Sequence, residues 1–113
     1  MDKYFPTQQL KVFTDKDFSD KDIKGTYFIL FYSKNSESSL LLPIWNKLAK
    51  NVHNTLGMCN LDTELEIAKK LEMKNPFILF FQDGKINGIF NGHKTYSCLK
   101  HFILSKEGMK EFL

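Results

Sequence analysis

The chain has 113 residues, of which 42% are hydrophobic and 26% are charged, and its formal net charge is +3. These values fit one folded domain of ordinary size and exclude an intrinsically disordered chain. All 16 basic residues are lysines, scattered from Lys3 to Lys110 and interleaved with acidic residues. Because arginine is the preferred partner of phosphates and guanine edges, this pattern argues against specific nucleic-acid binding.

Membrane and secretory signals are also missing from the sequence. The longest apolar runs, YFILFY and PFILFF, are far shorter than the roughly 20 residues of a membrane-spanning helix. The opening segment MDKYFPTQQL lacks the apolar core of a secretory signal, and Cys59 and Cys98 make no disulfide framework. We therefore expect an intracellular, cytoplasmic location or a place inside an assembled particle, although a lumenal domain whose signal has been removed would share these features.

Strand and helix patterns alternate along the first half of the chain. Residues 9–13 alternate in polarity and predict a short strand, and the acid-rich residues 15–23 predict a short helix with an aspartate cap. The continuous apolar run at 27–33 is typical of a central strand covered on both faces. Apolar residues then recur at helical spacing over 41–52, and Pro43 inside this pattern should kink the helix rather than end it.

The second half of the chain continues the alternation. Strands are expected at 55–62 and 75–81, and helices that begin near Glu64 and Thr95 follow from the spacing of apolar residues. Asp83-Gly84 is a strong signal for a two-residue turn, so the second of these strands should continue into a hairpin. The predicted order of elements is β-α-β-α-β-α-β-β-α.

This order predicts the fold class. Strands that alternate with helices imply parallel pairing, whereas the hairpin requires an antiparallel pair. We therefore expect an α/β domain in three layers, with a mixed central sheet flanked by helices. The domain should occupy residues 1–104 and leave a C-terminal tail at 105–113, which adds a frayed turn.

Four segments occur in a characteristic order: FYS at 31–33, LLLPIWNKLAK at 40–50, NPFILFFQDGK at 75–85 and FNGHKT at 90–95. Together they resemble a thioredoxin domain, most closely the catalytic-type domains of protein disulfide isomerases. In that resemblance they are the strand end before the CxxC motif, the kinked helix after it, the segment with the cis-proline (here Pro76), and the opening of the final helix. The resemblance implies a thioredoxin-like three-layer sandwich over nearly the whole chain.

The two cysteine positions of the CxxC motif are occupied by other residues. Counting back from Pro43 places them at Asn35 and Ser38, whereas counting forward from the FYS segment places them at Ser36 and Ser39. The loop is one residue shorter than in the family, so both alignments stay open. Neither alignment contains a cysteine.

Without these thiols the family's reaction has no reactant. Dithiol exchange begins with a thiolate that attacks a disulfide, and a serine hydroxyl cannot form that bond. Leu30 also replaces the buried acid that the resemblance would place before the motif, and the loop before Pro76 is short. We expect Cys59 and Cys98 to be inert small hydrophobes, so no catalytic residue is assigned. Slow thiol chemistry through Cys98 is the least favoured interpretation.

Metal and hydrolase sites are also weakly supported. His93, Cys98 and His101 share one stretch, but a structural zinc site needs four ligands, so no metal is expected. The serines near residue 36 lack the G-x-S-x-G pattern of a nucleophile elbow and fit helix caps instead, with Ser36 as the cap. No phosphate-binding glycine loop is present, so no cofactor is expected.

Two functional hypotheses remain. The first is a redox-inactive module that binds a protein partner, such as an extended peptide segment, without a covalent bond. The resemblance implies its contact residues: Asn35, Ser36, Glu37, Ser38, Ser39, Asn75, Pro76 and Gly92. The alternative is a structural subunit of a larger assembly, such as a virion or ribonucleoprotein component, that contacts its neighbours through Tyr4, Phe5 or the tail at 109–113.

Overall fold

The computed structural model describes residues 10–19, 24–52, 56–73, 76–105 and 109–111. Their elements, in chain order, are β1 (Leu10–Val12), α1 (Asp15–Ser19), β2 (Thr26–Tyr32), α2 (Ser36–Asn51), β3 (Leu56–Asn60), α3 (Leu65–Leu71), β4 (Phe77–Gln82), β5 (Lys85–Phe90), α4 (Tyr96–Ser105) and β6 (Met109–Glu111). The predicted order is confirmed through α4. The frayed turn expected in the tail is wrong in part, because Met109–Glu111 forms a short strand.

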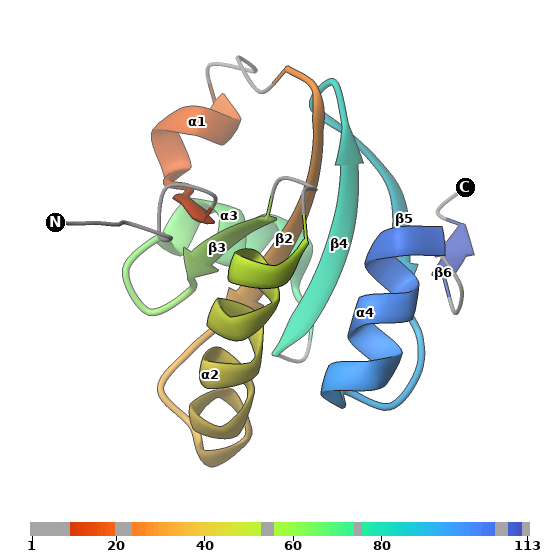
Figure 1. Ribbon diagram of the computed structural model, residues 1–113. Helices are drawn as coiled ribbons and strands as arrows, with labels where there is room; N and C mark the ends of the chain where they lie inside the picture. Colours follow the sequence, from red (N-terminus) through yellow and green to blue (C-terminus); the bar gives the residue numbers. More distant parts are fainter. Residues whose placement is uncertain (1–9, 20–23, 53–55, 74–75, 106–108, 112–113) are drawn as a thin grey trace, which may run out of the picture.

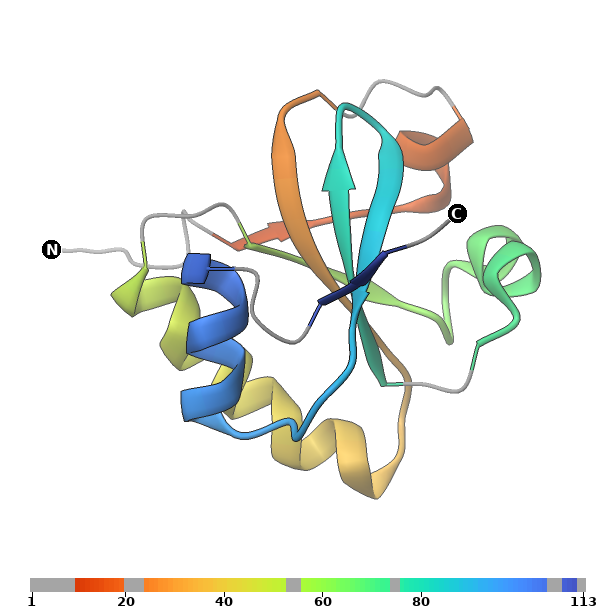
Figure 2. The ribbon, with the colours of Figure 1, turned by 90° about the vertical axis from the view of Figure 1, so that its right-hand side faces the viewer.

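The strands form one sheet in the order β1-β3-β2-β4-β5-β6. β3 pairs in parallel with both β1 and β2, and the other neighbours are antiparallel. Figure 2 shows α2 and α4 on one side of the sheet and α1 and α3 on the other. The predicted α/β class, with a mixed sheet between helices, is confirmed.

The pairing of β2 with β4 is antiparallel, although the alternation of strands and helices predicted parallel pairs outside the hairpin. The reason is the length of the connection between β3 and β4. α3 has only 7 residues and rises by about 10 Å, less than the roughly 17–20 Å of an average strand. It therefore does not return the chain to the other end of the sheet, and β4 starts at the end where β3 stops.

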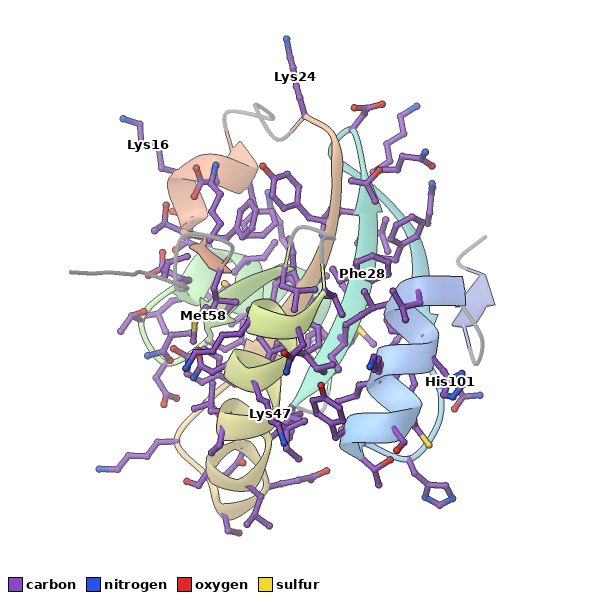
Figure 3. All side chains as sticks on the ribbon, viewed as in Figure 1. Lys16, Lys24, Phe28, Lys47, Met58 and His101 are labelled. Carbon is purple, nitrogen blue, oxygen red and sulfur yellow. The ribbon has the colours of Figure 1, made fainter. Side chains whose placement is uncertain are left out.

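The aromatic strand β2 supplies both faces of the core. Phe28 and Leu30 pack toward α2 and α4, whereas Ile29 and Phe31 pack toward α1 and α3. Figure 3 labels Phe28 on the α4 side, where its ring lies edge-on to Phe102. All four β2 residues are at most 1% exposed, as predicted for a central strand covered on both faces.

Two hydrogen bonds between distant parts of the chain hold the layers in place. The predicted Asp83-Gly84 turn is confirmed, with φ of 50° and 83°, and the Asp83 carboxylate accepts a 2.8 Å hydrogen bond from the Gly25 N–H. Trp45, one of the residues that suggested the resemblance, is buried on α2 and donates from Nε1 to the Gly57 carbonyl at 2.8 Å. Pro43 lies inside a continuous α2.

The start of α3 is capped from another part of the chain. The N-cap position is Glu64, which makes no side-chain cap. Instead, the Asp15 carboxylate at the start of α1 accepts from the Glu66 and Ile67 N–H groups at 3.2 and 2.9 Å, and Glu64 in turn accepts from the Asp15 N–H at 2.7 Å.

Candidate functional site

The start of α2 is organised by one amide side chain. Asn35 is the N-cap, and its Oδ1 accepts from the Ser38 N–H at 2.7 Å. Its Nδ2 donates to the Ser33 hydroxyl at 3.1 Å, and its carbonyl accepts from the Ser39 hydroxyl at the same distance. The expectation that Ser36 caps the helix is therefore wrong. Ser36 is the exposed first residue of α2, because the asparagine before it reaches the orphan N–H group.

Ser38 is, with Pro76, one of the two buried residues among the predicted contact residues that the structure describes. It is 1% exposed, and its hydroxyl oxygen accepts from the Ser33 N–H at 3.4 Å. Within residues 10–105 as far as they are described, no acceptor is found for its hydroxyl proton. A buried hydroxyl of this kind is well placed to donate to a bound ligand or to water.

A pocket of about 330 Å³ opens beside this helix start. Its lining residues come from β2, α2 and the end of β3: Tyr32, Ser33, Lys34, Ser38, Ser39, Leu42, Asn60 and Asp62. Asn60, the last residue of β3, reaches the pocket because it lies opposite Tyr32 in the parallel pair of β2 and β3. This volume lies at the lower end of the range of roughly 300–1,000 Å³ for ligand pockets.

Charges of both signs border this pocket. The Asp62 carboxylate accepts from the Lys34 N–H at 2.7 Å, which ties the loop after β3 to the loop before α2. Burial raises the pKa of the Tyr32 phenol, and the nearby Cys59 and Asp62 raise it further, so the phenol stays protonated at neutral pH and can donate. Lys16 and Lys24 project from the opposite end of the molecule (Figure 3).

The fold brings three of the predicted segments to this end of the molecule. Phe31 pairs with Phe77 at the start of β4. Pro76, the buried bend residue just before Phe77, therefore lies beside the end of β2. The exposed Gly92 lies in the loop before α4, and this loop is tied to α2 by the ion pair between Lys94 and Glu37, at 3.6 Å. Figures 1 and 2 both show these segments toward the same end. Asn75 lies outside the described residues.

Neither cysteine lines this pocket. Cys59 is buried in β3, where burial raises the pKa of its thiol to about 12 and the carboxylates of Glu64 and Asp15 add to the effect. Cys98 is partly exposed on α4, and the two thiols are not bonded to each other. In the part of the chain that the structure describes, no three metal-binding side chains come together, and no helix is long and apolar enough to cross a membrane.

Comparison with known proteins identifies the fold. No family model and no curated protein matches this sequence. The solved J-Trx1 fragment of ERdj5 superposes with a TM-score of 0.76 at 21% identity, over 87% of this chain and 50% of that chain. Zinc-bound human ERp44 gives 0.75 at 14% identity, over 86% of this chain and 31% of that one. The chain has a thioredoxin fold.

A third thioredoxin structure agrees with this assignment. The first two thioredoxin domains of Naumovozyma dairenensis Eps1p superpose with a TM-score of 0.72 at 20% identity, over 82% of this chain and 39% of that chain. The chain thus spans half or less of each of these three structures. The resemblance to thioredoxin domains that four segments indicated is confirmed at the level of the fold.

Several residues of the site were missed from the sequence. Tyr32, Asn60 and Asp62 line the pocket but were not predicted as contact residues. A signal for two of them was present, because polar side chains at the carboxyl ends of neighbouring parallel strands meet at one edge of a thioredoxin sheet. Lys34 and Leu42 carry no comparable signal, since only the folded loop and helix place them at the pocket.

Proposed function

We propose that this chain is a redox-inactive thioredoxin-fold module that binds a segment of a partner protein without a covalent bond, at the start of α2. One observation carries this proposal. The helix start that holds the reactive thiols in redox-active thioredoxin domains is occupied here by oxygen and amide groups of Asn35, Ser33 and Ser38, which hydrogen-bond to one another. None of these groups can form a disulfide with a substrate.

The alignment that counts back from Pro43 is the one that this geometry supports. It places the two cysteine positions at Asn35 and Ser38, which are the N-cap and a buried residue in the first turn of α2. The other alignment would place them at Ser36 and Ser39, which are both exposed. A helix N-terminus lowers the pKa of a cysteine thiol and so activates it. In this alignment the capping asparagine occupies the position of that activated cysteine.

The remaining thiols are poor substitutes for the missing pair. Cys59 is fully buried, and at neutral pH its raised pKa keeps the thiol protonated and weakly nucleophilic. Cys98 lies on α4, which belongs to the opposite layer from the packing around Cys59. Exchange through two cooperating thiols would therefore require a large rearrangement of the fold.

Non-covalent binding is supported by what surrounds the helix start. The pocket offers donors from Tyr32 and Ser38 and an acceptor in Asp62, which together suit the peptide groups and polar side chains of an extended segment. The bend at Pro76 lies next to the end of β2, where it could border such a segment. Each contact would be reversible and independent of the redox state.

The experiment compares partner recovery by two matched variants. Immobilised wild-type chain, Ser39→Arg and Ser97→Arg are incubated with cell extract, with and without dithiothreitol. Ser39 is exposed and lines the pocket, whereas Ser97, at the start of α4, is also exposed but does not line it. We expect wild type and Ser97→Arg to recover the same partners with or without reductant, and Ser39→Arg to lose most of them.

Two results would contradict the proposal. Partners that disappear on addition of dithiothreitol would indicate mixed disulfides, and turnover of insulin disulfides by the pure chain would indicate an active thiol pair. Stoichiometric recovery in a particle that Ser39→Arg leaves unchanged would favour the assembly-subunit alternative. That alternative relies on Tyr4, Phe5 and the tail side chains, which lie outside the described residues.

A further inference from the structure

We infer that Asn91 is the site of a slow covalent modification, the deamidation of its side chain through a cyclic imide formed with the backbone nitrogen of Gly92. The inference does not depend on the proposed function, because the reaction needs only the chain and water. It also goes beyond the sequence motif, since the chain contains a second asparagine-glycine pair, Asn87-Gly88, that the fold protects.

An asparagine that precedes a glycine is especially prone to this reaction. The backbone nitrogen of the following residue must reach the Cγ atom of the asparagine, and glycine permits this because it has no Cβ and adopts many backbone angles. Both Asn87-Gly88 and Asn91-Gly92 meet this requirement. From the sequence alone the two pairs are expected to react alike, so any difference between them comes from the fold.

The pair Asn87-Gly88 is held in the sheet. Both residues belong to β5, and Gly88 is buried and paired with Phe80 of β4 on one side and Glu111 of β6 on the other. The Asn87 side chain donates from Nδ2 to Gln82 Oε1 at 2.6 Å, which holds the amide group that would have to leave. Because a paired strand keeps its backbone extended, this pair reacts only after local opening of the sheet.

The pair Asn91-Gly92 has none of these restraints. It follows directly after Phe90, the last residue of β5, and both of its residues are exposed. Within the described ranges, neither the Asn91 side chain nor the Gly92 N–H has a hydrogen-bond partner. The atoms nearest to a Cβ built on Gly92 all belong to the Phe90 ring, so no other backbone crowds that side of the glycine. The Gly92 nitrogen can therefore turn toward Asn91 Cγ without any change in the sheet.

The reaction balances with water as its only co-reactant and changes no oxidation state. The Gly92 amide gives its proton to the solvent, its nitrogen attacks Asn91 Cγ, and the new C–N bond closes a succinimide ring. The bond from Cγ to Nδ2 then breaks, and Nδ2 takes a proton from the solvent and leaves as ammonia. Water adds to either carbonyl of the ring and opens it to aspartate or isoaspartate.

The product changes the loop before α4 in two ways. A carboxylate replaces a neutral amide, so the formal net charge of +3 falls by one. In isoaspartate the Cβ methylene also enters the main chain, which lengthens the loop directly before Gly92. The same loop carries Lys94, whose ion pair with Glu37 ties it to the start of α2. Deamidation would thus change both charge and backbone at the edge of the predicted contact surface.

The experiment compares the two pairs within one chain. The full chain is incubated at mildly alkaline pH, once folded and once in urea, and peptide mapping by mass spectrometry quantifies aspartate and isoaspartate at each position. In the folded chain we expect Asn91 to react at least about tenfold faster than Asn87, because a strand residue must first open against its local stability. In urea the two rates should become similar. Folded Asn91→Gln should keep a single charge state in isoelectric focusing, because glutamine would have to close a larger ring.

Several results would overturn the inference. Equal rates in the folded chain, or a faster reaction at Asn87, would show that the sheet gives no protection relative to the loop. An Asn91 that reacts in urea but stays intact in the folded chain would show that the loop protects it as well. An acidic species that still accumulates in folded Asn91→Gln would place the modification at another residue. None of these results bears on the proposed function, which the partner recovery by Ser39→Arg tests separately.

Discussion

The two helical layers of this thioredoxin fold are built in different ways. On one side of the sheet, α2 has 16 residues and α4 has 10, and α2 carries its own cap in Asn35. On the other side, α1 has 5 residues and α3 has 7, and α3 is capped by Asp15 from the start of α1. Helices this short are unstable alone, so the second layer depends on contacts between its members.

This difference bears on where function can lie. The helix α2 is capped from within its own segment, since Asn35 accepts from the Ser38 N–H. The short layer uses its carboxylates internally, since Asp15 and Glu64 each accept from the backbone of the other's segment. A site for a partner is therefore easier to accommodate on the side of α2 than on that of α3.

The largest effect is expected from Trp45→Ala, which removes the central side chain of the long layer. Trp45 is fully buried, and its Nε1 donates to the Gly57 carbonyl. The cavity and the unsatisfied carbonyl should lower the free energy of unfolding by about 3–5 kcal/mol. Urea denaturation measures this, with Leu104→Ala on the surface of α4 as a control that should change little. A loss of under about 1 kcal/mol would show that α2 does not depend on its core contacts.

The second largest loss of stability is expected from Gly57→Ala, which affects the layer of α1 and α3. A Cβ at this position would lie 2.4 Å from Cε2 of Phe13, whose ring packs on the side of α1 and α3. Overpacking of this kind costs about 1–3 kcal/mol. Gly92→Ala is the matched control, since its Cβ would meet only the Phe90 ring, at 3.1 Å. Equal losses in both variants, measured by thermal unfolding, would argue against a tight contact between β3 and Phe13.

Removing the two caps sharpens the comparison directly. Asp15→Ala and Asn35→Ala should each cost about 1 kcal/mol, as is usual for a lost helix cap. Their effects on hydrogen exchange should differ, because Asp15 lies in α1 and caps α3, whereas Asn35 caps the helix that directly follows it. We expect faster exchange in both α1 and α3 for Asp15→Ala, and only at the start of α2 for Asn35→Ala. Changes confined to α1 in the first variant would contradict the cross-cap.

The smallest effect concerns the buried thiol. The pKa of Cys59 is raised from about 9 to about 12 in the fold, so the folded state keeps a proton that the unfolded state releases. This contribution to stability is complete below about pH 9 and is lost as the pH rises toward about 12. In the native chain at pH 8, a thiol reagent should label Cys98 and spare Cys59 until denaturant is added. Equal labelling rates would show that β3 opens easily.

Much of the fold could be predicted from local patterns. The apolar runs of β2 and β4 and the Asp83-Gly84 turn each follow from neighbouring residues, and all are present. The cap of α3 could not be predicted, because Asp15 lies far from Glu66 and Ile67 in the sequence.

The candidate site, too, could be predicted only where it depends on neighbouring residues. From the sequence, the cysteine positions could be narrowed to two alignments, Asn35 and Ser38 or Ser36 and Ser39, and the structure places Asn35 at the cap and Ser38 in the first turn of α2. The pocket could be found only from the folded chain, because Asn60 and Asp62 reach it through the pairing of β3 with β2. The ion pair between Glu37 and Lys94 likewise forms only in the folded chain, because the loop before α4 brings Lys94 to α2.

The hydrogen bonds of Asn35 also oppose the introduction of thiols at the start of α2. Cysteine at this position would remove the acceptor for the Ser38 N–H and the donor to Ser33. Cysteine at Ser38 would place a larger sulfur atom where the serine side chain is already buried. An engineered pair of thiols at these two positions should therefore destabilise the start of α2, so a variant designed for electron transfer would need compensating changes around the helix cap.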